Sequence, residues 1–424
     1  MKNYKYKMTV IMPSYNNGQY IKQALDSILV QEVDFDYQII ITDDGSQDNS
    51  PQIIKEYAEM YSDKVLALYS EKNCHLFQNM LKALKRMDSE YFCVLDPDDY
   101  WTDKKRLKKA VDFLDQHPDY TIYASNEEKL FNDGSIEIYY NRPNITTKTS
   151  TYADFLKGKE VLSNTLASTY RNVYFSNGIP DEYSALVGTK FEEMFRADSF
   201  RNLIHLKRGK AYFVNESIGC ARRHGKGLAS SLSEYERYIT SAFAHIAFFE
   251  FFGKRNETDY VRIIKKLYIT AVKLYLQALV SEKMPIITER YTEYFKTVME
   301  WLQEHQVCGK ESRIPFSLER FSEISYRKII LWGSGLEADR LVSRYHIPIS
   351  EDTFFVDNDR RKQGTEFMGK LIKAPEALYN EKDALLIIVS SYYKEIIEQI
   401  KEQGLCAEDR IVNIYDYEKY GIWS

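Results

Sequence analysis

The chain has 424 residues, of which 44% are hydrophobic, so it is long enough to bury more than one core. Its formal net charge of −5 excludes the overall basic field of most nucleic-acid-binding proteins, and we expect no nucleic acid partner. The five cysteines are isolated and form no CxxC pair, which argues against a disulfide framework or a structural zinc site and is typical of the cytoplasm. No run approaches the roughly 20 apolar residues of a membrane helix, and the N-terminus lacks the apolar stretch of a signal peptide.

The first hundred residues alternate between two kinds of pattern. Helical periodicity is found in three stretches: 18–31, 50–62 and 77–87. Short runs rich in β-branched and aromatic residues, which indicate strands, are found in four: 8–15, 37–46, 65–71 and 91–99. This order predicts an α/β domain with a mostly parallel sheet, helices on its faces, and ligands at the carboxyl ends of its strands.

After residue 120 the predicted secondary-structure pattern changes twice. Residues 120–230 are less regular, with strand-like segments at 120–126 and 209–221. The pattern is helical from about residue 234 to 304, and the strand and helix alternation restarts at Arg327. We therefore expect an α/β domain over residues 1–232, a helical region over 233–320 and a smaller α/β domain over 321–424.

Three carboxylates follow the strand at 91–95. Asp96, Asp98 and Asp99 repel one another unless a cation or a basic partner compensates their charge. One interpretation is a solvated turn that caps the next helix. The other is a site for Mg²⁺ or Mn²⁺, ions that prefer oxygen ligands. A second acidic pair, Asp43 and Asp44, ends a neighbouring predicted strand and favours the metal site.

The C-terminal α/β domain contains a glycine motif. Gly333, Gly335 and Ala338 form a GxGxxA pattern between a strand and a helix, and Asp357 follows about twenty residues later, as in a dinucleotide fingerprint. The domain is too short for a complete two-half dinucleotide fold, and no Tyr-x-x-x-Lys pair supports an NAD-dependent oxidoreductase. Two roles stay open: nucleotide or cofactor binding through Gly333, Gly335 and Asp357, and a structural role that includes homo-oligomerisation.

Four blocks together resemble a known family. The blocks VIMPSYNNGQYIKQALDSILVQ, YQIIITDDGSQDNS, EKNCHLFQNMLKAL and SEYFCVLDPDDYW are similar in order and spacing to family 2 glycosyltransferases of the GT-A fold. The resemblance spans roughly residues 8–115 and extends more weakly to about 230. It implies a GT-A domain that transfers a sugar, with inversion and with Mn²⁺ or Mg²⁺, from a nucleotide diphosphate. It also implies a saccharide, glycoconjugate or lipid-linked acceptor in bacterial surface polysaccharide synthesis.

The resemblance assigns a nucleotide site to the first two blocks. Pro13 and Tyr15 match the nucleotide contact of the family's first strand, and Tyr15 offers an aromatic face to the base. Asp43 matches the carboxylate that accepts a hydrogen bond from the base N3–H, which suits uracil, so we expect a UDP-linked donor. Asp44 is expected to order the turn. The sequence departs from the family at His75, which stands at the usual glycine position.

The resemblance also assigns metal and diphosphate contacts. Asp98 is expected to be the direct metal ligand, with Asp99 close behind it, and Asp96 to contact ribose or the donor sugar. In the late segment CARRHG, His224 matches a second metal ligand or diphosphate contact, and Arg222 a diphosphate contact. The alternative for His224 is a surface histidine in a basic loop.

Inverting transfer needs a general base that takes the proton of the acceptor hydroxyl. In relatives an acidic residue lies about a dozen positions before the glycine of a GK strand, and that spacing selects Asp198 here. Glu192 and Glu193 are near enough to compete with it. An alternative function is a catalytically inactive nucleotide-sugar sensor, which would lack this base. A nucleotidyltransferase is disfavoured, because MPSYNNGQY lacks a glycine-rich basic loop.

The sequence of the helical region does not decide whether its exposed face contacts water or a membrane. Its expected role is a packed bundle, but Lys265, Lys266 and Lys273 could face an anionic membrane that carries a lipid-linked acceptor. We therefore expect a cytoplasmic protein, with peripheral contact to the inner face of the membrane as the alternative.

Overall fold

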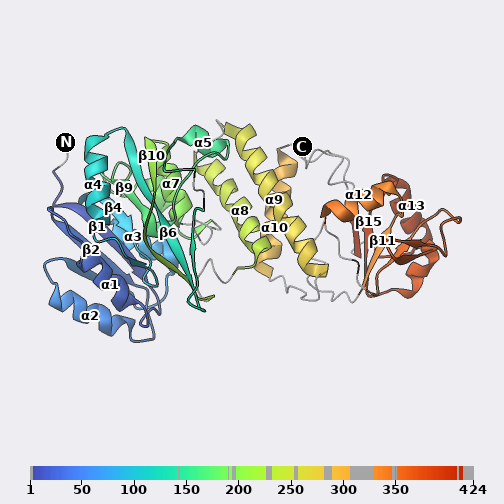
Figure 1. Cartoon of the computed structure of the whole chain (residues 1–424), viewed down its shortest axis with the longest axis horizontal. Helices are drawn as coiled ribbons and strands as arrows, with labels where there is room; N and C mark the ends of the chain where they lie inside the picture. The colour runs from blue at the N-terminus through green and yellow to red at the C-terminus, as the bar shows by residue number, and fades with distance from the viewer. Residues whose placement is uncertain are drawn as a thin grey trace. The chain divides into compact units, whose positions relative to one another are not determined.

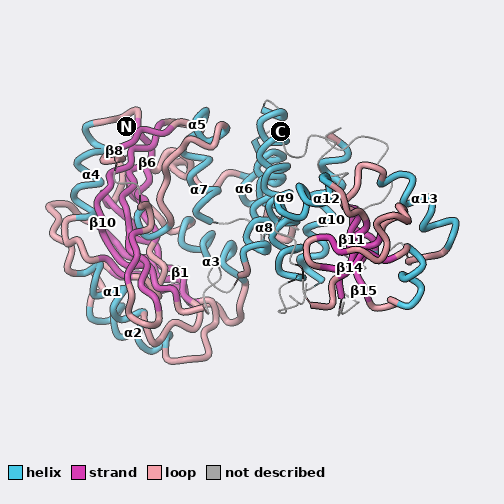
Figure 2. The backbone as a smooth tube through the Cα atoms, turned by 45° about the vertical axis from the view of Figure 1, so that its right-hand side comes forward, coloured by secondary structure: helices cyan, strands magenta, loops and turns pink. Residues whose placement is uncertain are grey.

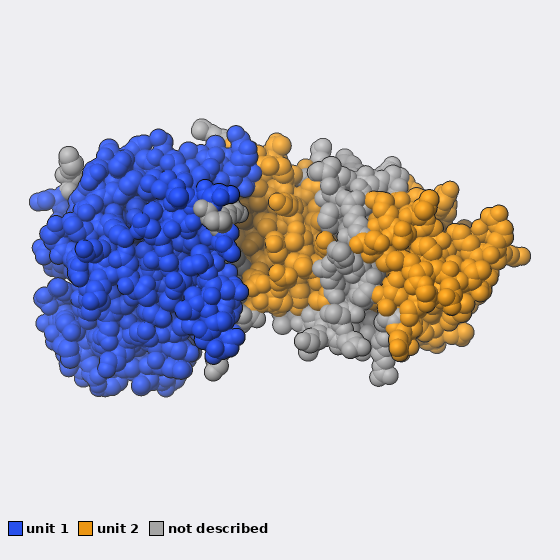
Figure 3. Space-filling view, in the orientation of Figure 1, with its two compact units in different colours: residues 1–231 blue, residues 232–424 orange. Residues whose placement is uncertain are grey.

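The computed structural model describes residues 3–141, 144–189, 191–192, 197–225, 232–252, 256–280, 289–305, 328–345, 349, 351–407 and 410–413. The chain divides into two compact units, Met1–Ser231 and Leu232–Ser424, which Figure 3 colours blue and orange. The further division of the second unit at residue 320 stays a prediction.

The first unit is built on a 10-stranded sheet with the order β3-β2-β1-β4-β9-β6-β10-β5, in which β7 pairs with β6 and β8 with β10. Its strands β1 to β4 are parallel, as the sequence predicted. The strands are β1 (Tyr6–Ser14), β2 (Tyr37–Asp43), β3 (Val65–Tyr69), β4 (Ser89–Val94), β5 (Tyr100–Trp101), β6 (Tyr120–Phe131), β7 (Ile136–Ile138), β8 (Thr147–Ser150), β9 (Ser168–Arg171) and β10 (Lys210–Arg223).

Helices flank this sheet, and Figure 1 shows how α1 to α4 follow its first strands. Helix α1 buries Ile21, Ala24, Leu25 and Ile28, which recur at helical spacing, against the strands. The helices are α1 (Ile21–Leu29), α2 (Ser50–Met60), α3 (His75–Leu84), α4 (Arg106–Gln116), α5 (Tyr152–Leu156), α6 (Asp181–Ser184), α7 (Ala197–Leu206) and the 3₁₀ helix η1 (Thr165–Ala167).

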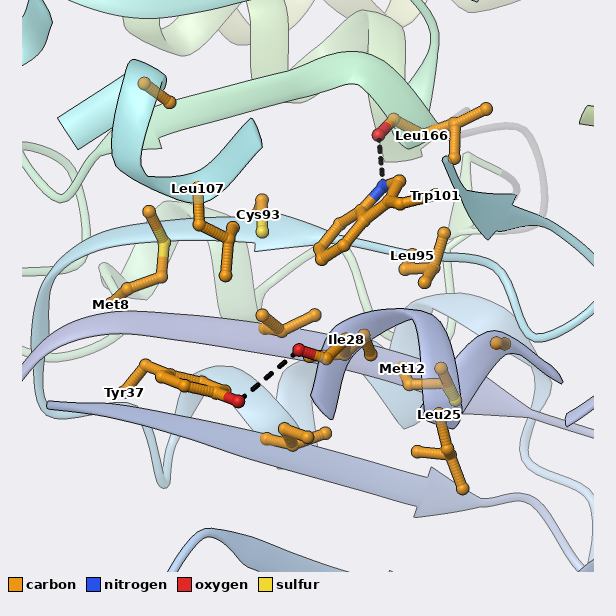
Figure 4. Close-up of a cluster of buried hydrophobic side chains, with 14 of the residues drawn as sticks. Met8, Met12, Leu25, Ile28, Tyr37, Cys93, Leu95, Trp101, Leu107 and Leu166 are labelled. Atoms are coloured by element: carbon orange, nitrogen blue, oxygen red, sulfur yellow. Dashed lines mark hydrogen bonds between the residues drawn. The ribbon is translucent and has the colours of Figure 1, made fainter. Parts of the chain in front are cut away.

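The core of the first unit lies between the sheet and helices α1, α2 and α4. Met8, Met12, Cys93 and Leu107 are among its fully buried members (Figure 4). Trp101 also packs there, and its indole Nε1 donates a hydrogen bond to the carbonyl oxygen of Leu166 at 3.0 Å. The core therefore fixes the chain on both sides of the acidic turn that follows β4.

Strand β10 brings distant segments together. It pairs with β6 in parallel and with β5 in antiparallel, where Gly219 lies opposite Trp101 and Cys220 opposite Tyr100. Its register with β6 shifts three times, and such irregularities bend a strand and turn its side chains. As a result, the end of β10 lies beside the acidic turn before β5.

The second unit begins with three helices, α8 (Glu234–Phe252), α9 (Glu257–Val280) and α10 (Glu289–Glu304), which Figure 2 shows as a cyan group. Aromatic side chains pack where they meet; Phe249 contacts Tyr260 and Trp301 edge to face. None of the described helices combines the length and the hydropathy that crossing a membrane requires.

The second unit continues with a 6-stranded sheet in the order β13-β14-β12-β11-β15-β16. Its strands are parallel except for β13, and its core holds Ile330, Trp332, Val356 and Ile388. The predicted second, smaller α/β sheet at the C-terminal end is thus present. Its elements are β11 (Lys328–Trp332), α12 (Leu336–Tyr345), β12 (Phe354–Val356), β13 (Glu366–Phe367), β14 (Lys370–Lys373), η4 (Pro375–Asn380), β15 (Ala384–Ile388), α13 (Tyr393–Gln403) and β16 (Ile411–Asn413).

Candidate active site

The two acidic clusters, Asp43–Asp44 and Asp96–Asp99, lie at the same edge of the first sheet, where β2 and β4 end. Ser14 of β1 pairs with Asp43 of β2, and Ile11 of β1 pairs with Val94 of β4. Asp96 follows Val94 and therefore emerges near the same end of β1. The two acidic strands are not direct neighbours, because β1 lies between them. Since paired strands are about 4.8 Å apart, the two clusters are roughly 10 Å apart across β1.

The two aspartates after β2 hold two different loops. Both carboxylate oxygens of Asp43 accept hydrogen bonds from Ser46, from its backbone N–H at 3.0 Å and from its hydroxyl at 2.6 Å. Asp44 instead accepts from the backbone N–H of Cys74 at 3.0 Å. The prediction that Asp44 orders the turn is therefore wrong; Asp43 does so, since a short acidic side chain reaches the amides just after it.

The other nucleotide candidates lie beside this turn. Pro13 is buried at the end of β1, whereas Tyr15 is 44% exposed just beyond the strand. His75 has φ of 67°, so the backbone keeps the left-handed conformation that a glycine usually takes. The structure thus leaves the ring of Tyr15 open to a planar ligand at the carboxyl edge of the sheet.

The turn after β4 presents Asp98 to a histidine. The backbone N–H of Asp99 donates to the carbonyl oxygen of Asp96 at 3.0 Å and closes a tight turn around Pro97. Asp98 Oδ2 lies 3.0 Å from His224 Nε2, and both side chains are mostly buried. The His224 ring also stacks on Tyr20, with 5.3 Å between ring centroids. His224 thus lies in a loop but is partly buried against Asp98 and Tyr20, and its role as a ligand stays a prediction.

Arg222 holds this turn in place. Its backbone N–H donates to Asp99 Oδ1 at 2.9 Å, and its guanidinium donates to the carbonyl oxygen of Asp98 and to Gln23. The guanidinium also lies over the rings of Tyr20 and Tyr100, at 5.0 and 4.7 Å. Several donors of Arg222 thus position the acidic turn.

Burial and the charge of the neighbouring Asp98 disfavour the charged forms of Asp96 and Asp99. Burial and the charge of Asp98 raise the pKa of Asp96 to about 7. Burial, Asp98 and Asp96 likewise raise the pKa of Asp99 well above its ordinary value. A nearby cation would relieve both effects.

Asp98 and His224 fit such an ion. Adjacent ligands of an octahedral ion, each about 2.1 Å from it, lie about 3 Å apart, and phosphates and water commonly complete the shell. Among the described residues, no group of three or more His, Cys, Asp and Glu side chains is arranged to hold a metal ion. The residues that would hold an ion here are Asp98 and His224.

The candidate bases have different surroundings. Asp198 lies in the first turn of α7 and accepts from the backbone N–H of Ser199 at 2.6 Å, and its charge contributes to the raised pKa of Asp96. Glu192 is buried, and one of its oxygens accepts from the backbone N–H of Gly188. Glu193 lies outside the described residues. Asp198 is thus the described candidate that acts electrostatically on the acidic turn.

Sequence reasoning missed three polar residues near this turn: the buried Glu127 and Arg201 and the partly buried Asn164. Glu127 lies on β6, and Asn164 Nδ2 donates to its Oε1 at 2.7 Å. The charge of Arg201 opposes the rise in the pKa of Asp96. No spacing rule marks these residues, but the polar run SNEE within a mostly buried strand was a usable signal for Glu127.

In the C-terminal unit, Asp357 accepts hydrogen bonds from the loop that contains Gly333 and Gly335. Gly333 has φ of 122°, and a Cβ there would lie 2.9 Å from the carbonyl oxygen of Val389. Asp357 Oδ2 accepts hydrogen bonds from the backbone and the hydroxyl of Ser334 and from Lys362 Nζ at 3.1 Å. Burial acts to raise the pKa of Asp357, but hydrogen bonds from the Ser334 hydroxyl, the Asp359 backbone and Lys362 keep it below its ordinary value. Ligand binding through Gly333, Gly335 and Asp357 stays a prediction.

Two parts of the chain match known families. Residues 9–172 match the family described as Glycosyl transferase family 2, and residues 325–412 match the family described as C2185-like, N-terminal.

Individual relatives match part of the chain. An uncharacterized protein of Mycobacterium tuberculosis is 28% identical over 221 residues, which cover 52% of this chain and 60% of that protein. The putative teichuronic acid biosynthesis glycosyltransferase TuaG of Bacillus subtilis is 35% identical over 114 residues, which cover 27% of this chain and 44% of TuaG. The chain thus matches less than two thirds of the length of either relative.

Among solved structures, residues 1–349 of S. aureus TarS in complex with UDP-GlcNAc align with a TM-score of 0.46 and 17% identity, covering 70% of this chain and 92% of that one. The mannosyltransferase PcManGT from Pyrobaculum calidifontis, in complex with GDP-Man and Mn²⁺, aligns with a TM-score of 0.42 and 16% identity, covering 73% and 89%. Residues 9–172 of the N-terminal unit thus match glycosyl transferase family 2, and this unit has the GT-A fold.

Proposed function

We propose that the N-terminal unit transfers a sugar, with inversion, from a UDP-sugar to a saccharide or lipid-linked acceptor of a bacterial surface polysaccharide. The family match supports glycosyl transfer, and the similarity to TuaG, named as a putative teichuronic acid biosynthesis glycosyltransferase, supports a surface polymer. The observation that carries the proposal is the pairing of Asp98 with His224 beside two carboxyl groups of raised pKa. A diphosphate with its divalent ion would neutralise this crowded charge.

The donor would lie along the carboxyl edge of the sheet. Tyr15 would stack on the uracil ring beside Pro13, and Asp43 would accept a hydrogen bond from its N3–H. Each oxygen of Asp43 already accepts from Ser46, but a carboxylate oxygen accepts more than one hydrogen bond. Asp96 would contact ribose or the donor sugar.

The diphosphate would lie near the turn after β4. Asp98 and His224 would hold Mn²⁺ or Mg²⁺, with Asp99 behind them, and the ion would supply the charge that stabilises the departing diphosphate. Arg222 would keep the turn in position and offer its remaining donor capacity to phosphate oxygens.

The chemical step would use Asp198. Its carboxylate would take the proton of the acceptor hydroxyl while the hydroxyl oxygen forms a bond to the anomeric carbon. The bond from that carbon to the diphosphate oxygen breaks on the opposite face, so the configuration inverts. UDP leaves with the electron pair, and the proton stays on Asp198.

A thermal-shift experiment with UDP and Mn²⁺ tests the donor site. Ligand that binds only the folded protein raises its midpoint by mass action. We expect UDP with Mn²⁺ to stabilise the wild type and the control variant Asp63→Ala, whose side chain is exposed, but not Asp98→Ala. Equal stabilisation of Asp98→Ala would remove the metal assignment. Release of UDP from a UDP-sugar would then distinguish an enzyme from an inactive sensor.

A further inference from the structure

The segment 163–168 lies against the chain that follows the acidic turn. Leu166 accepts a hydrogen bond from Trp101 Nε1 at 3.0 Å, as Figure 4 shows, and Trp101 comes two residues after Asp99. Arg106 Nη2 donates to the same carbonyl oxygen at 3.1 Å. Leu166, Trp101 and Arg106 are all buried. One side of this segment is thus fixed to the chain that directly follows the turn with the proposed metal ligand Asp98.

The same segment also contacts the helix that carries the proposed base. Arg201 Nη2 donates to Thr165 Oγ1 at 3.3 Å. Arg201 lies three residues after Asp198 on α7, about one helical turn away and so on a similar side of the helix. Asn164, the residue before Thr165, therefore belongs to a segment that contacts both the chain after the acidic turn and the helix of the proposed base.

A buried carboxyl group fixes the side chain of Asn164. Glu127 is fully buried, and its Oε1 accepts a hydrogen bond from Asn164 Nδ2 at 2.7 Å. In the structure the amide NH₂ of Asn164 faces Glu127, so the Oδ1 of the same amide group points away from Glu127 Oε1. Asn164 is itself only partly buried, so a ligand can approach it.

The other carboxyl oxygen of Glu127 accepts no hydrogen bond from the described residues. Glu127 Oε2 is buried and has no hydrogen-bond partner among the described residues, an arrangement that costs free energy and calls for an explanation. The charge of Glu127 acts on both Asp96 and Asp99, and the charge of Asp198 acts on Glu127. A polar group kept in this position at such a cost fits a role in the site better than a role in the core.

We propose that Asn164 Oδ1 accepts a hydrogen bond from a saccharide hydroxyl at the active site, and that Glu127 is a positioning residue that holds the amide in this orientation. The proposal rests on the proposed sugar transfer. Both the donor sugar and an acceptor saccharide carry such hydroxyl groups, and UDP without its sugar lacks the one recognised here. Asn164 therefore selects for the sugar and leaves the affinity for the nucleotide unchanged.

Calorimetric titrations and kinetics with Asn164→Ala test the contact. The probes are UDP, UDP-glucose, UDP-galactose and UDP-GlcNAc with Mn²⁺, followed by UDP release in the presence of p-nitrophenyl glycosides. We expect the Kd of UDP to stay within about twofold of wild type, whereas loss of one hydrogen bond weakens a sugar-dependent constant about tenfold. A higher Kd for a UDP-sugar places the hydroxyl on the donor, and a higher KM for the glycoside places it on the acceptor.

A double-mutant cycle tests the role of Glu127. Because Glu127→Gln can still accept from Asn164, the same constant should change by only about threefold. The double variant should be no weaker than Asn164→Ala alone, since Glu127 acts through Asn164. A purely structural role would lower the thermal midpoint without this pattern. Asn164→Ser, which keeps a small polar side chain, repeats the test if Asn164→Ala does not fold.

The two proposals fail in different ways. If UDP binds but both Asn164 variants leave every sugar-dependent constant unchanged, the inference about Asn164 is overturned and the nucleotide site stands. If the effects of the two single variants multiply, Glu127 does not act through Asn164. If wild type neither binds UDP with Mn²⁺ nor releases it from any UDP-sugar, the proposed function itself fails.

Discussion

At the scale of single residues, the site is a cluster of five carboxyl groups, which His224 and Arg222 approach. Asp96, Asp98 and Asp99 share one turn, and Glu127 and Asp198 act on it from β6 and α7. His224 and Arg222 come to this turn from the end of β10. This composition favours a ligand that brings a divalent cation with it.

Asp198→Asn tests the base. The amide keeps the size of the side chain but cannot accept the proton of the acceptor hydroxyl, so we expect transfer to fall at least about 100-fold. Stabilisation by UDP with Mn²⁺ should persist, because Asp198 makes no contact with the nucleotide in our proposal. Glu192→Gln is the matched comparison, and initial rates of UDP release measure both variants. Full activity in Asp198→Asn would redirect the role to Glu192 or Glu193.

Glu127→Gln should change how stability depends on pH. Burial, as the largest cause, raises the pKa of Glu127 from 4.5 to about 7. The folded protein then binds this proton more tightly than the unfolded chain, so the free energy of unfolding falls as pH rises from about 4.5 to about 7. Relative to Glu127→Gln, the wild type should lose on the order of 3 kcal/mol across this window.

Urea denaturation at about pH 5 and about pH 8 measures this difference, with the exposed Glu137→Gln as the control. Glu137→Gln should follow the wild type at both values. If Glu127→Gln shows the same pH dependence as the wild type, Glu127 does not titrate in this range.

At the scale of elements, the short pairing of β10 with β5 builds the metal turn. Gly219 lies opposite Trp101, and a Cβ at Gly219 would be 2.5 Å from the carbonyl oxygen of Tyr100. Such a distance requires the backbone to move. Because Tyr100 directly follows Asp99, the absence of a side chain at Gly219 determines how closely Arg222 and His224 approach the aspartates.

Gly219→Ala should therefore damage both stability and ligand binding. We expect the free energy of unfolding to fall by roughly 1–3 kcal/mol and the stabilisation by UDP with Mn²⁺ to shrink. Gly335→Ala is the matched control, since its Cβ would meet only Lys362 Nζ at 3.9 Å. Chemical denaturation and thermal shift measure the two effects. A Gly219→Ala protein that behaves like Gly335→Ala would show that the two strands can separate without consequence for the site.

At the scale of the whole molecule, the described candidate residues of the transferase site lie in one unit. Tyr15, Asp43, Asp98, Asp198 and His224 all belong to Met1–Ser231, which has a hydrophobic core of its own. The second unit has a separate core around Ile330 and Trp332. Domains with their own cores can fold alone.

A fragment of residues 1–231 should therefore fold and bind UDP with Mn²⁺. We expect its Kd for UDP to lie within about threefold of that of the full chain, since the proposed contacts are all present. Isothermal titration calorimetry compares the two proteins, and the fragment with Asp98→Ala is the control. A folded fragment that does not bind UDP would show that the nucleotide site needs residues after 231.

Local patterns in the sequence were sufficient for the elements and for the acidic strand ends. Alternating runs predicted β1 to β4 and α1 to α3, and parallel strands place their carboxyl ends at one edge, so Asp43 and Asp96 had to share it. The pairing of His224 with Asp98, the closure of the glycine loop by Asp357 and the contact of Glu127 with Asn164 were decided only by the tertiary structure. These contacts join residues 126, 23 and 37 positions apart, and they depend on strand register and on burial, which no local pattern encodes.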